Sequence, residues 1–400
     1  MTASQEIAAR IRPELIALRR EIHADPELGN DNPRTQAKIL AALDGLGLEV
    51  STGTALTSVV AVLRGRGGGD GERPAVLLRG DMDGLPVVED TGQEFASTNG
   101  NMHACGHDLH VAGLVGAAKI LHELRDELPG DVVFMFQPGE EGPGGAGPMI
   151  AEGVLDAAGP RVDAAYGLHV TSHQFPLGVW FGRPGVQMAA VDHGTIVVRG
   201  RGGHGSEPHK AADPVPVACE IAIALQTMVT RQFHAFDPVV VTVGKIAAGS
   251  KENIIPDTAQ LDLTVRTFSE ANHSVIGARI TRLAEGIAAA HGMTAEVDYQ
   301  GLYPQTVNDA AEYAHLVDTI GDLFGAEAHI ELPYPIAGAE DFSLVGQQVP
   351  SAFVFVSAYS GDDPSTAAAN HSARAMFDDA VLADCSALLA EAALRRLRRS

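Results

Sequence analysis

The sequence predicts an α/β fold with a central mixed sheet flanked by helices, and a smaller α+β domain inserted into it. Short, nearly continuous apolar segments such as 75–80 and 131–137 are typical of buried strands, and segments with helical spacing lie between them. A chain of 400 residues exceeds what one hydrophobic core usually serves. From 186 to 298 strands and helices follow in a mixed order, which indicates a separate module. We therefore expect one domain from 1–185 and 299–400, with the inserted domain at 186–298.

The spacing of apolar residues predicts the main elements of the larger domain. A first helix is expected from Ser4 to Glu21 and a second from Pro33 to Leu46. Val50 to Leu63 is expected to form two strands, and the glycine-rich segment from Arg64 to Arg73 a surface loop. A closing helix is expected from Asp379 to Arg398.

The inserted segment shows both the alternating pattern of strands and the apolar spacing of helices. Its alternating and helical patterns predict the following strands and helices, in chain order: a strand at Val191–Arg199, a helix at Ala211–Thr230, strands at Val239–Ile246 and Leu261–Thr267, and a helix at Glu270–His291.

Charge and cysteine content exclude several classes of protein. The formal net charge of −23 argues against binding to nucleic acid or to an anionic membrane surface. The three cysteines, Cys105, Cys219 and Cys385, are far apart and odd in number, which does not suit a disulfide framework and favours a cytoplasmic location. No apolar segment reaches the length of a membrane-spanning helix, and the first residues do not resemble a signal peptide.

Acidic or imidazole side chains follow three of the predicted strands. Asp81 and Asp83 come at the end of the first, Glu140 and Glu141 follow the second, and His169 follows a shorter third strand. In an open α/β sheet the carboxyl ends of such strands share one edge, so we expect these groups to converge.

The stretch from His103 to His110 carries a thiol, three imidazoles and a carboxylate within eight residues. Cys105 and His107 are separated by one glycine, a spacing that lets both side chains reach a metal ion where a loop meets a helix. His103 and His110 are expected to be structural or to support ligands.

These motifs resemble those of the M20 metallopeptidase clan. More narrowly, the chain is similar to its amidohydrolase branch of hippurate hydrolases, N-acyl-amino-acid aminoacylases and plant indole-acetyl-amino-acid hydrolases. The resemblance covers nearly the whole length and rests on segments in a fixed order: Arg20–Gly29, Leu78–Pro86, Asn101–His110, Gln137–Gly142, Gly167–His169, Gly200–His209, Asn253–Pro256, Gly338–Phe342 and His371. Asp81 stands where the peptidase branch carries a ligand histidine, which is why the chain is placed in the branch with a cysteine ligand.

The resemblance implies a homodimer formed through the inserted domain, which also acts as a lid, and a binuclear metal site in each subunit. The metal ligands would be Cys105, His107, Glu141, His169 and His371. Glu140 matches the family's general base, and Asp83 the acid that orients a metal ligand. His204 resembles the histidine that reaches across the dimer to hold the substrate carbonyl. Asn253 and Arg266 resemble positions that hold the substrate's amide or carboxylate.

The expected reaction is hydrolysis of the amide bond of N-acyl amino acids. Two divalent ions can lower the pKa of a water molecule and polarise the carbonyl, while an adjacent carboxylate moves the proton. Zinc, manganese, cobalt and nickel are all candidates, and a thiolate ligand at Cys105 disfavours magnesium and calcium. The positive ions also give an acidic protein a local site for an anionic substrate.

Two alternatives remain open at this point. The chain could be an M20 exopeptidase or dipeptidase, if its pocket accepts a free α-amine in the acyl part. It could also be a metal-free binding protein that keeps the fold, although every expected ligand and Glu140 are present. Asn30-Asp31-Asn32 and Ser372-Ala373 depart from the family pattern, and they put the acyl specificity in question.

Overall fold

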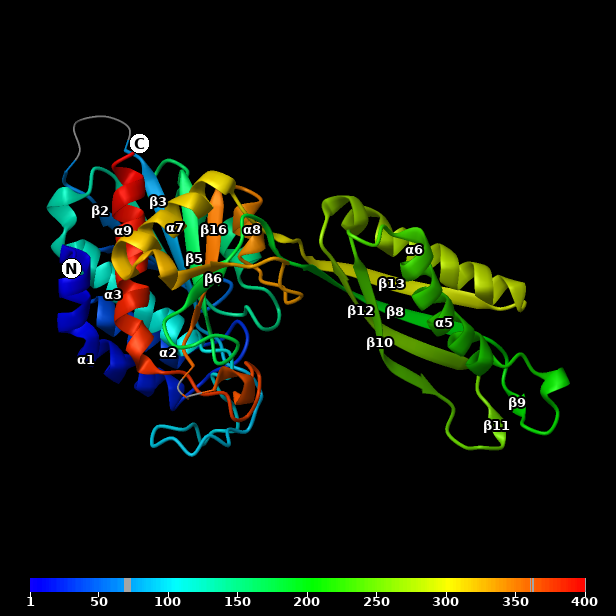
Figure 1. Cartoon of the computed structure of the whole chain (residues 1–400). Helices are drawn as coiled ribbons and strands as arrows, with labels where there is room; N and C mark the ends of the chain where they lie inside the picture. The colour runs from blue at the N-terminus through cyan, green and yellow to red at the C-terminus, as the bar shows by residue number, and fades with distance from the viewer. Residues whose placement is uncertain (68–72, 360, 362, 400) are drawn as a thin grey trace. The chain divides into compact units, whose positions relative to one another are not determined.

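The computed structural model describes residues 1–67, 73–359, 361 and 363–399, and the chain forms two compact units (Figure 1). Unit 1 contains Met1–Gly185, Val307–Tyr334 and Leu344–Ser400, and unit 2 contains Val186–Thr306 and Pro335–Ser343. Of the loop expected from Arg64 to Arg73, residues 68–72 lie outside the described part.

An eight-stranded mixed sheet is the centre of unit 1, in the order β1-β2-β4-β3-β5-β16-β6-β15. The neighbours β4, β3, β5 and β16 are parallel, and every residue in them is buried, which is why their sequences are apolar almost throughout. β2 pairs antiparallel with β4, and β1 with β2. The bounds are β1 Glu49–Thr52, β2 Val59–Arg64, β3 Ala75–Asp81, β4 Asp131–Gln137, β5 Ala164–Thr171, β6 Trp180–Gly182, β15 His329–Glu331 and β16 Ser351–Ser357. The predicted mixed α/β sheet with flanking helices is confirmed.

The helices α3 and α9 pack on β3 and on each other, and α1 packs against both (Figure 1). α1 begins at a capping box, in which Thr2 and Gln5 exchange side-chain and backbone hydrogen bonds. The α-helices of this unit are α1 Ala3–His23, α2 Pro33–Leu43, α3 His107–Glu123, α4 Ala146–Ala151, α7 Ala310–Phe324, α8 Ser343–Gly346 and α9 Leu382–Leu397, and its 3₁₀ turns are Arg125–Glu127, Val154–Asp156, Ala326–Ala328, Pro364–Thr366 and Asp379–Val381.

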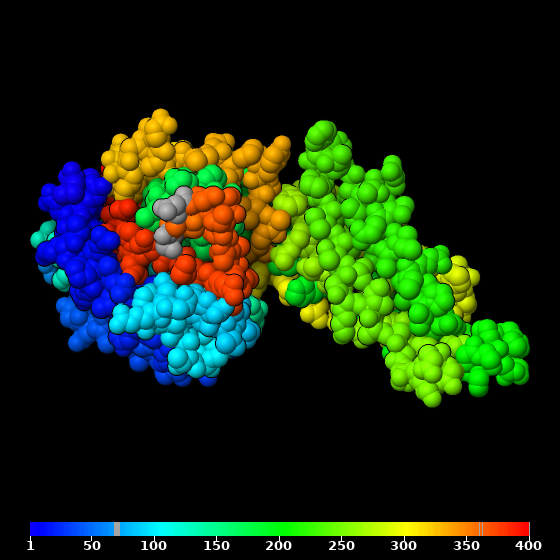
Figure 2. Space-filling model, turned by 60° about the horizontal axis from the view of Figure 1, so that its bottom comes forward, coloured from blue at the N-terminus to red at the C-terminus, as the bar shows by residue number. Residues whose placement is uncertain are grey.

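Segments far apart in the sequence meet on the surface of unit 1. The segment 85–100 lies beside the segment 365–378, as the cyan and orange-red surfaces of Figure 2 show. Arg374 donates to Asp90 at 2.8 Å, and the backbone N–H of Asp90 donates to Ala373 at 2.8 Å.

Unit 2 is a four-stranded antiparallel sheet in the order β10-β12-β8-β13, with its own apolar core between the sheet and two helices. The bounds are β8 Ala190–Arg199, β9 Gly203–His204, the 3₁₀ turn Pro208–Lys210, α5 Pro214–Gln232, β10 Val239–Ala248, β11 Ile254–Ile255, β12 Thr258–Thr267, α6 Glu270–Ala290 and β13 Thr294–Tyr303. β7 (Gly185–Met188) and β14 (Thr306–Asn308) lie where the chain passes between the units.

The boundary expected at 298 falls inside β13, which pairs with β8 as far as Tyr303. This strand was not among the predicted elements, although Ala295, Val297 and Tyr299 alternate with polar residues. The segment Pro335–Ser343 also belongs to unit 2, and its distance along the sequence from the rest of that unit explains why composition did not reveal it.

No helix in the described residues is long and apolar enough to cross a membrane.

The packing of α3 against its neighbours gives a test of the core. A Cβ on Gly116 would lie 2.8 Å from Leu15 Cδ1 and 2.8 Å from Ser386 Cβ, so the helices approach closely because this residue has no side chain. We expect Gly116→Ala to lower the free energy of unfolding by about 1–3 kcal/mol through overpacking. The measurement is urea denaturation followed by circular dichroism.

The matched control is Gly321→Ala in α7 of the same unit, where an added Cβ would meet nothing within 4 Å. Helix propensity alone should raise stability there by about 0.5–1 kcal/mol. Equal effects of the two substitutions would contradict the close packing of α3.

Candidate metal centre

Three neighbouring strands deliver functional side chains to one edge of the sheet in unit 1. β3 ends at Asp81, opposite Gln137 at the end of β4, and the Glu140–Glu141 pair follows β4. Asp83 lies two residues beyond the end of β3. His169 is inside β5, which continues past the end expected from sequence. The strands are parallel, so their carboxyl ends meet, as the sequence predicted.

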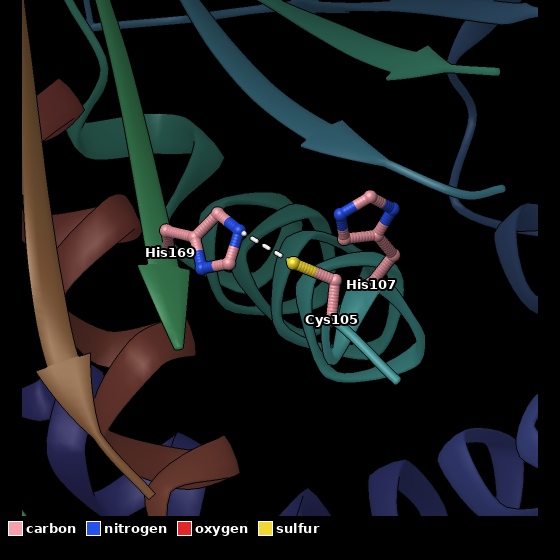
Figure 3. Close-up of side chains that lie close together, drawn as sticks. All are labelled: Cys105, His107 and His169. Atoms are coloured by element: carbon pink, nitrogen blue, oxygen red, sulfur yellow. Dashed lines mark hydrogen bonds between the residues drawn. The ribbon is translucent and has the colours of Figure 1, made fainter. Parts of the chain in front are cut away.

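A tight turn at the start of α3 presents Cys105 and His107 to the same region (Figure 3). Gly106 has φ 84°, a left-handed conformation that suits glycine, and an added Cβ would lie 2.3 Å from Val170 Cγ2. The glycine therefore lets the turn sit directly against β5. His107 is the first residue of the helix, so the side chains of Cys105 and His107 have fixed directions.

Two buried imidazoles direct a ring nitrogen into this cluster. Nδ1 of His169 is 2.7 Å from the carbonyl oxygen of Val170, and Nδ1 of His107 is 2.8 Å from that of Asp83. A carbonyl only accepts, so each Nδ1 donates and each Nε2 is left for other partners. The Cys105 thiol donates to His169 Nε2 at 3.4 Å (Figure 3). His107 Nε2 is buried and makes no hydrogen bond within the described residues.

Asp83 positions the two adjacent glutamates. Its Oδ1 accepts the backbone N–H of Glu140 at 3.0 Å, and its Oδ2 accepts that of Glu141 at 3.1 Å. Both glutamate backbones are thereby held beside His107, whose Nε2 is 3.9 Å from Glu141 Oε1. The Glu140 carboxyl group is buried next to them and belongs to the same group of close ligand atoms.

His371 completes the cluster from the C-terminal part of the chain. Its Nε2 lies 2.9 Å from Glu141 Oε1, while 55% of the side chain is exposed. The residue has φ 71°, a left-handed backbone that is uncommon outside glycine, and its N–H donates to Ala104 at 2.8 Å. This hydrogen bond ties the His371 loop to the residue before Cys105.

Asp81 and His110 support the cluster from behind. His110 Nε2 accepts the backbone N–H of Val170 at 2.9 Å, so the ring proton lies on Nδ1 and is donated to Asp81 at 2.5 Å. Both nitrogens are used, so His110 offers no lone pair to an ion. Arg79, fully buried, donates to Asp81 at 2.7 Å. Arg79 was not among the predicted site residues, although its spacing of two from Asp81 places both side chains on the same face of β3.

The electrostatics of the cluster follow from burial and from Asp81. Burial, together with the charge of Glu141, raises the pKa of the Cys105 thiol to about 12. Burial opposes a charge on His107, but the Asp81 carboxylate 3.4 Å away, together with Asp83 and Cys105, outweighs it and raises the pKa of His107 well above 6.5. Burial lowers the pKa of His169 well below 6.5, so that ring is neutral at pH 7.

These residues fit divalent transition-metal ions. The ligand atoms of three sets lie within 4.8 Å of one another: Cys105, His107 and His169; Cys105, Glu141 and His371; and His107, Glu140 and Glu141. Thiol, imidazole and carboxylate donors together suit zinc and its neighbours better than magnesium or calcium. The buried Nε2 of His107, which makes no hydrogen bond within the described residues, is the kind of atom that a metal ion satisfies.

The other expected site residues belong to unit 2. His204 lies in β9, paired with Ile254 of β11, and is exposed. Its Nδ1 accepts the backbone N–H of Ser206 at 3.1 Å, so a neutral ring carries its proton on Nε2. The carbonyl oxygen of Asn253 accepts the N–H of Gly205 at 2.9 Å, which places Asn253 beside the His204 loop.

Arg266 lies in β12, at the end of the strand away from this loop. From Thr258 to Arg266 the strand covers about 25 Å at the usual rise per residue. Burial lowers the pKa of its guanidinium, and no salt bridge or hydrogen bond to that group occurs among the described residues.

Comparison with known proteins agrees with this geometry. Residues 77–395 match Peptidase family M20/M25/M40. Thermostable carboxypeptidase 1 of Saccharolobus solfataricus is 38% identical over 373 residues, which cover 92% of this chain and 91% of that protein. IAA-amino acid hydrolase ILR1-like 4 of Arabidopsis thaliana is 38% identical over 347 residues, covering 86% and 76%.

Among solved structures, the YXEP protein of Bacillus subtilis, a dinuclear metal-binding peptidase of the M20 family, superposes with a TM-score of 0.82. It is 31% identical, and the match covers 98% of this chain and 99% of that one. The chain is thus an enzyme, a hydrolase that acts on amide bonds. It belongs to Peptidase family M20/M25/M40, and the family resemblance seen in the sequence motifs is confirmed.

The pKa values in the cluster predict that metal uptake releases protons. At pH 7 Cys105 is a neutral thiol, and His107, with its raised pKa, is an imidazolium. Both must lose a proton to coordinate, so we expect about two protons per saturated subunit, and an affinity that rises with pH below both pKa values. Zinc titration of the metal-free protein in a weakly buffered indicator solution measures the number.

Cys105→Ala should release one proton fewer, whereas the matched variant of the exposed Cys219, Cys219→Ala, should leave the number unchanged. Identical release by Cys105→Ala and the wild type would remove Cys105 from the ligand set. Alkylation is a poor test, because a thiol with a pKa of about 12 reacts slowly even without metal.

Proposed function

We propose that the chain hydrolyses N-acyl amino acids at the amide bond, with two divalent metal ions bound in each subunit. The observation that carries the proposal is the convergence of Cys105, His107, Glu141, His169 and His371 beside Glu140. Two of the ligand groups share Cys105, which supports two ion positions close together. Zinc, manganese, cobalt and nickel all suit these donors.

Glu140 is the proton carrier in this proposal. Bound divalent ions would supply Lewis acidity, which lowers the pKa of water and polarises the amide carbonyl. Asp83 holds the backbone of Glu140 beside that of the ligand Glu141, so that the Glu141 carboxylate binds metal and the Glu140 carboxylate, in the same cluster, acts on the substrate. Glu140 takes a proton from the attacking water and returns it to the departing nitrogen, which leaves as an amine.

The relatives support the substrate class. A carboxypeptidase and an IAA-amino acid hydrolase both cleave an amide whose nitrogen belongs to an amino acid. The released amino acid carries a carboxylate, which a guanidinium binds well, and we assign Arg266 to this role with Asn253 holding the amide. The carboxypeptidase relatives also favour a second candidate, the cleavage of peptides.

We also propose that the enzyme is a homodimer that associates through unit 2, which acts as a lid. The His204 loop lies near the Thr258 end of β12 and Arg266 near its other end, too far apart for one unit 2 to present both to one small substrate. Two copies can do so, with His204 donating from Nε2 to the carbonyl oxygen in the neighbouring subunit. The edge strand β10, with Val240 and Ile246 exposed, is a suitable contact surface. Three free cysteines suit the cytoplasm.

The decisive experiment is a hydrolysis screen of the metal-loaded protein against N-acetyl, N-benzoyl and long-chain N-acyl amino acids, with matched dipeptides. Faster turnover of the acyl amino acids supports the proposal, and faster turnover of the dipeptides supports the peptidase.

Substitution of Glu140 by glutamine, the corresponding amide, tests the role of Glu140. Glu140→Gln should keep both metal ions, because all five proposed ligands remain, and should lower turnover by roughly 10²-fold or more. Glu141→Gln is the matched neighbour, and it should lose bound metal as well as turnover. Near-normal turnover by fully metallated Glu140→Gln would exclude Glu140 as the base.

Assembly is tested by mixing two inactive variants, Glu140→Gln and His204→Ala. In a heterodimer one site has both an intact base and an intact histidine from its partner, so each heterodimer should regain up to about half of the activity of a wild-type dimer. The control mixes each variant with itself under the same exchange conditions. If subunit exchange is demonstrated and no activity returns, His204 does not act across the dimer.

A further inference from the structure

The side chain of Asn370 bridges three segments of unit 1. Its Nδ2 donates to the carbonyl oxygens of Val170 at 3.1 Å and of Cys105 at 3.3 Å, and lies 3.7 Å from Cys105 Sγ. Its Oδ1 accepts the backbone N–H of Ser172 at 2.9 Å, which fixes the orientation of the amide. One side chain thus joins the turn before α3, the end of β5 and the loop of His371.

These contacts are made with a proposed metal ligand, or with a residue close to one in the chain. The Val170 carbonyl that Asn370 binds also accepts the Nδ1 proton of His169, which sets the direction of that ring. The Cys105 contact reaches the ligand itself, through both its carbonyl and its sulfur. His371 is the next residue in the chain, and its left-handed backbone needs a firm anchor.

The side-chain amide of Asn370 suits this position better than a leucine or an aspartate side chain of similar size would. A thiolate ligand carries charge and gains from an N–H donor, and the sulfur lies within reach of Nδ2. Leucine would leave the Val170 carbonyl and the Ser172 N–H without this partner, and aspartate would keep the acceptor for Ser172 but set a negative charge against the sulfur. Only an amide offers donors on one side and an acceptor on the other.

We propose that Asn370 is a positioning residue of the metal centre: it fixes the relative positions of Cys105, His169 and His371, and it shares one of its two amide N–H groups between the carbonyl oxygen and the thiolate of Cys105. The inference rests on the metal centre proposed above and concerns a residue outside the ligand set. Hydrogen bonds of this kind to metal ligands change metal affinity by roughly 10- to 100-fold.

The test uses cobalt(II) in the full-length protein, because a thiolate bound to cobalt gives a charge-transfer band in the near ultraviolet. Asn370→Ala removes both sides of the amide, and Asn370→Asp keeps only the acceptor. An N–H donor lowers the energy of the sulfur lone pair, so both variants should shift the band to longer wavelength. Asn370→Ala should also weaken cobalt binding roughly 10- to 100-fold in competition with a chromophoric chelator.

Ser172→Ala is the matched control. It removes the Ser172 hydroxyl, which donates to Ala368 at 2.7 Å and also lies 3.1 Å from Asn370 Oδ1, but it keeps the stronger backbone N–H bond to Oδ1 and every contact of Nδ2. The band and the affinity should stay at wild-type values. A shift in Ser172→Ala as large as in Asn370→Asp would mean that the loop alone matters, and would overturn the proposal.

Different results would overturn the proposed metal centre and the proposed role of Asn370. A wild-type protein with no thiolate-to-cobalt band would overturn the metal centre, and the role of Asn370 with it. A wild-type band that Asn370→Ala and Asn370→Asp leave unchanged, with unchanged affinity, would overturn only the role of Asn370.

Discussion

Asp83 accepts three hydrogen bonds, and the rest of the site depends on them. Its carboxylate takes the backbone N–H groups of Glu140 and Glu141, at 3.0 and 3.1 Å, and its carbonyl takes the Nδ1 proton of His107 at 2.8 Å. This single residue, which follows β3, therefore fixes the positions of both the loop after β4 and the first residue of α3. Because Asp83 is buried, these bonds are shielded from competition with water.

The charges of the site are arranged in pairs rather than left free. Asp81 would be an isolated buried anion at the strand end, which is very unfavourable, but Arg79 and His110 each contribute a hydrogen bond to it. Those two partners keep Asp81 ionised, and its charge in turn acts on His107. An acidic chain can thus keep a group of metal-binding side chains in one region, while its net charge outside that region stays the same.

The parts of the site that sequence could predict are those set by short-range rules. Strand ends carrying Asp81, Asp83 and the Glu140–Glu141 pair follow from the apolar segments before them, and the Cys105–His107 spacing follows from the chemistry of a turn. Parallel pairing then brings them together without further information.

Long-range partners could not be predicted in the same way. Asn370 has no distinctive spacing at all, and its partners Cys105 and Val170 lie 265 and 200 positions away along the chain. The same holds for Pro335–Ser343, which joins unit 2 from a distant part of the sequence. Each depends on contacts between residues far apart in the chain, for which local patterns carry no signal.

The packing of α9 on α3 has a consequence for the order of events during synthesis. α9 is a 16-residue helix at the end of the chain, and α3, which begins with His107, packs against it. His371 also emerges late. A nascent chain can therefore complete most of unit 2, whose main segment ends at Thr306, while the earlier part of unit 1 still lacks its last helix. Until α9 has been synthesised, the unfinished core leaves uncovered the apolar surface of α3 and β3 on which α9 packs, so a chaperone can bind there.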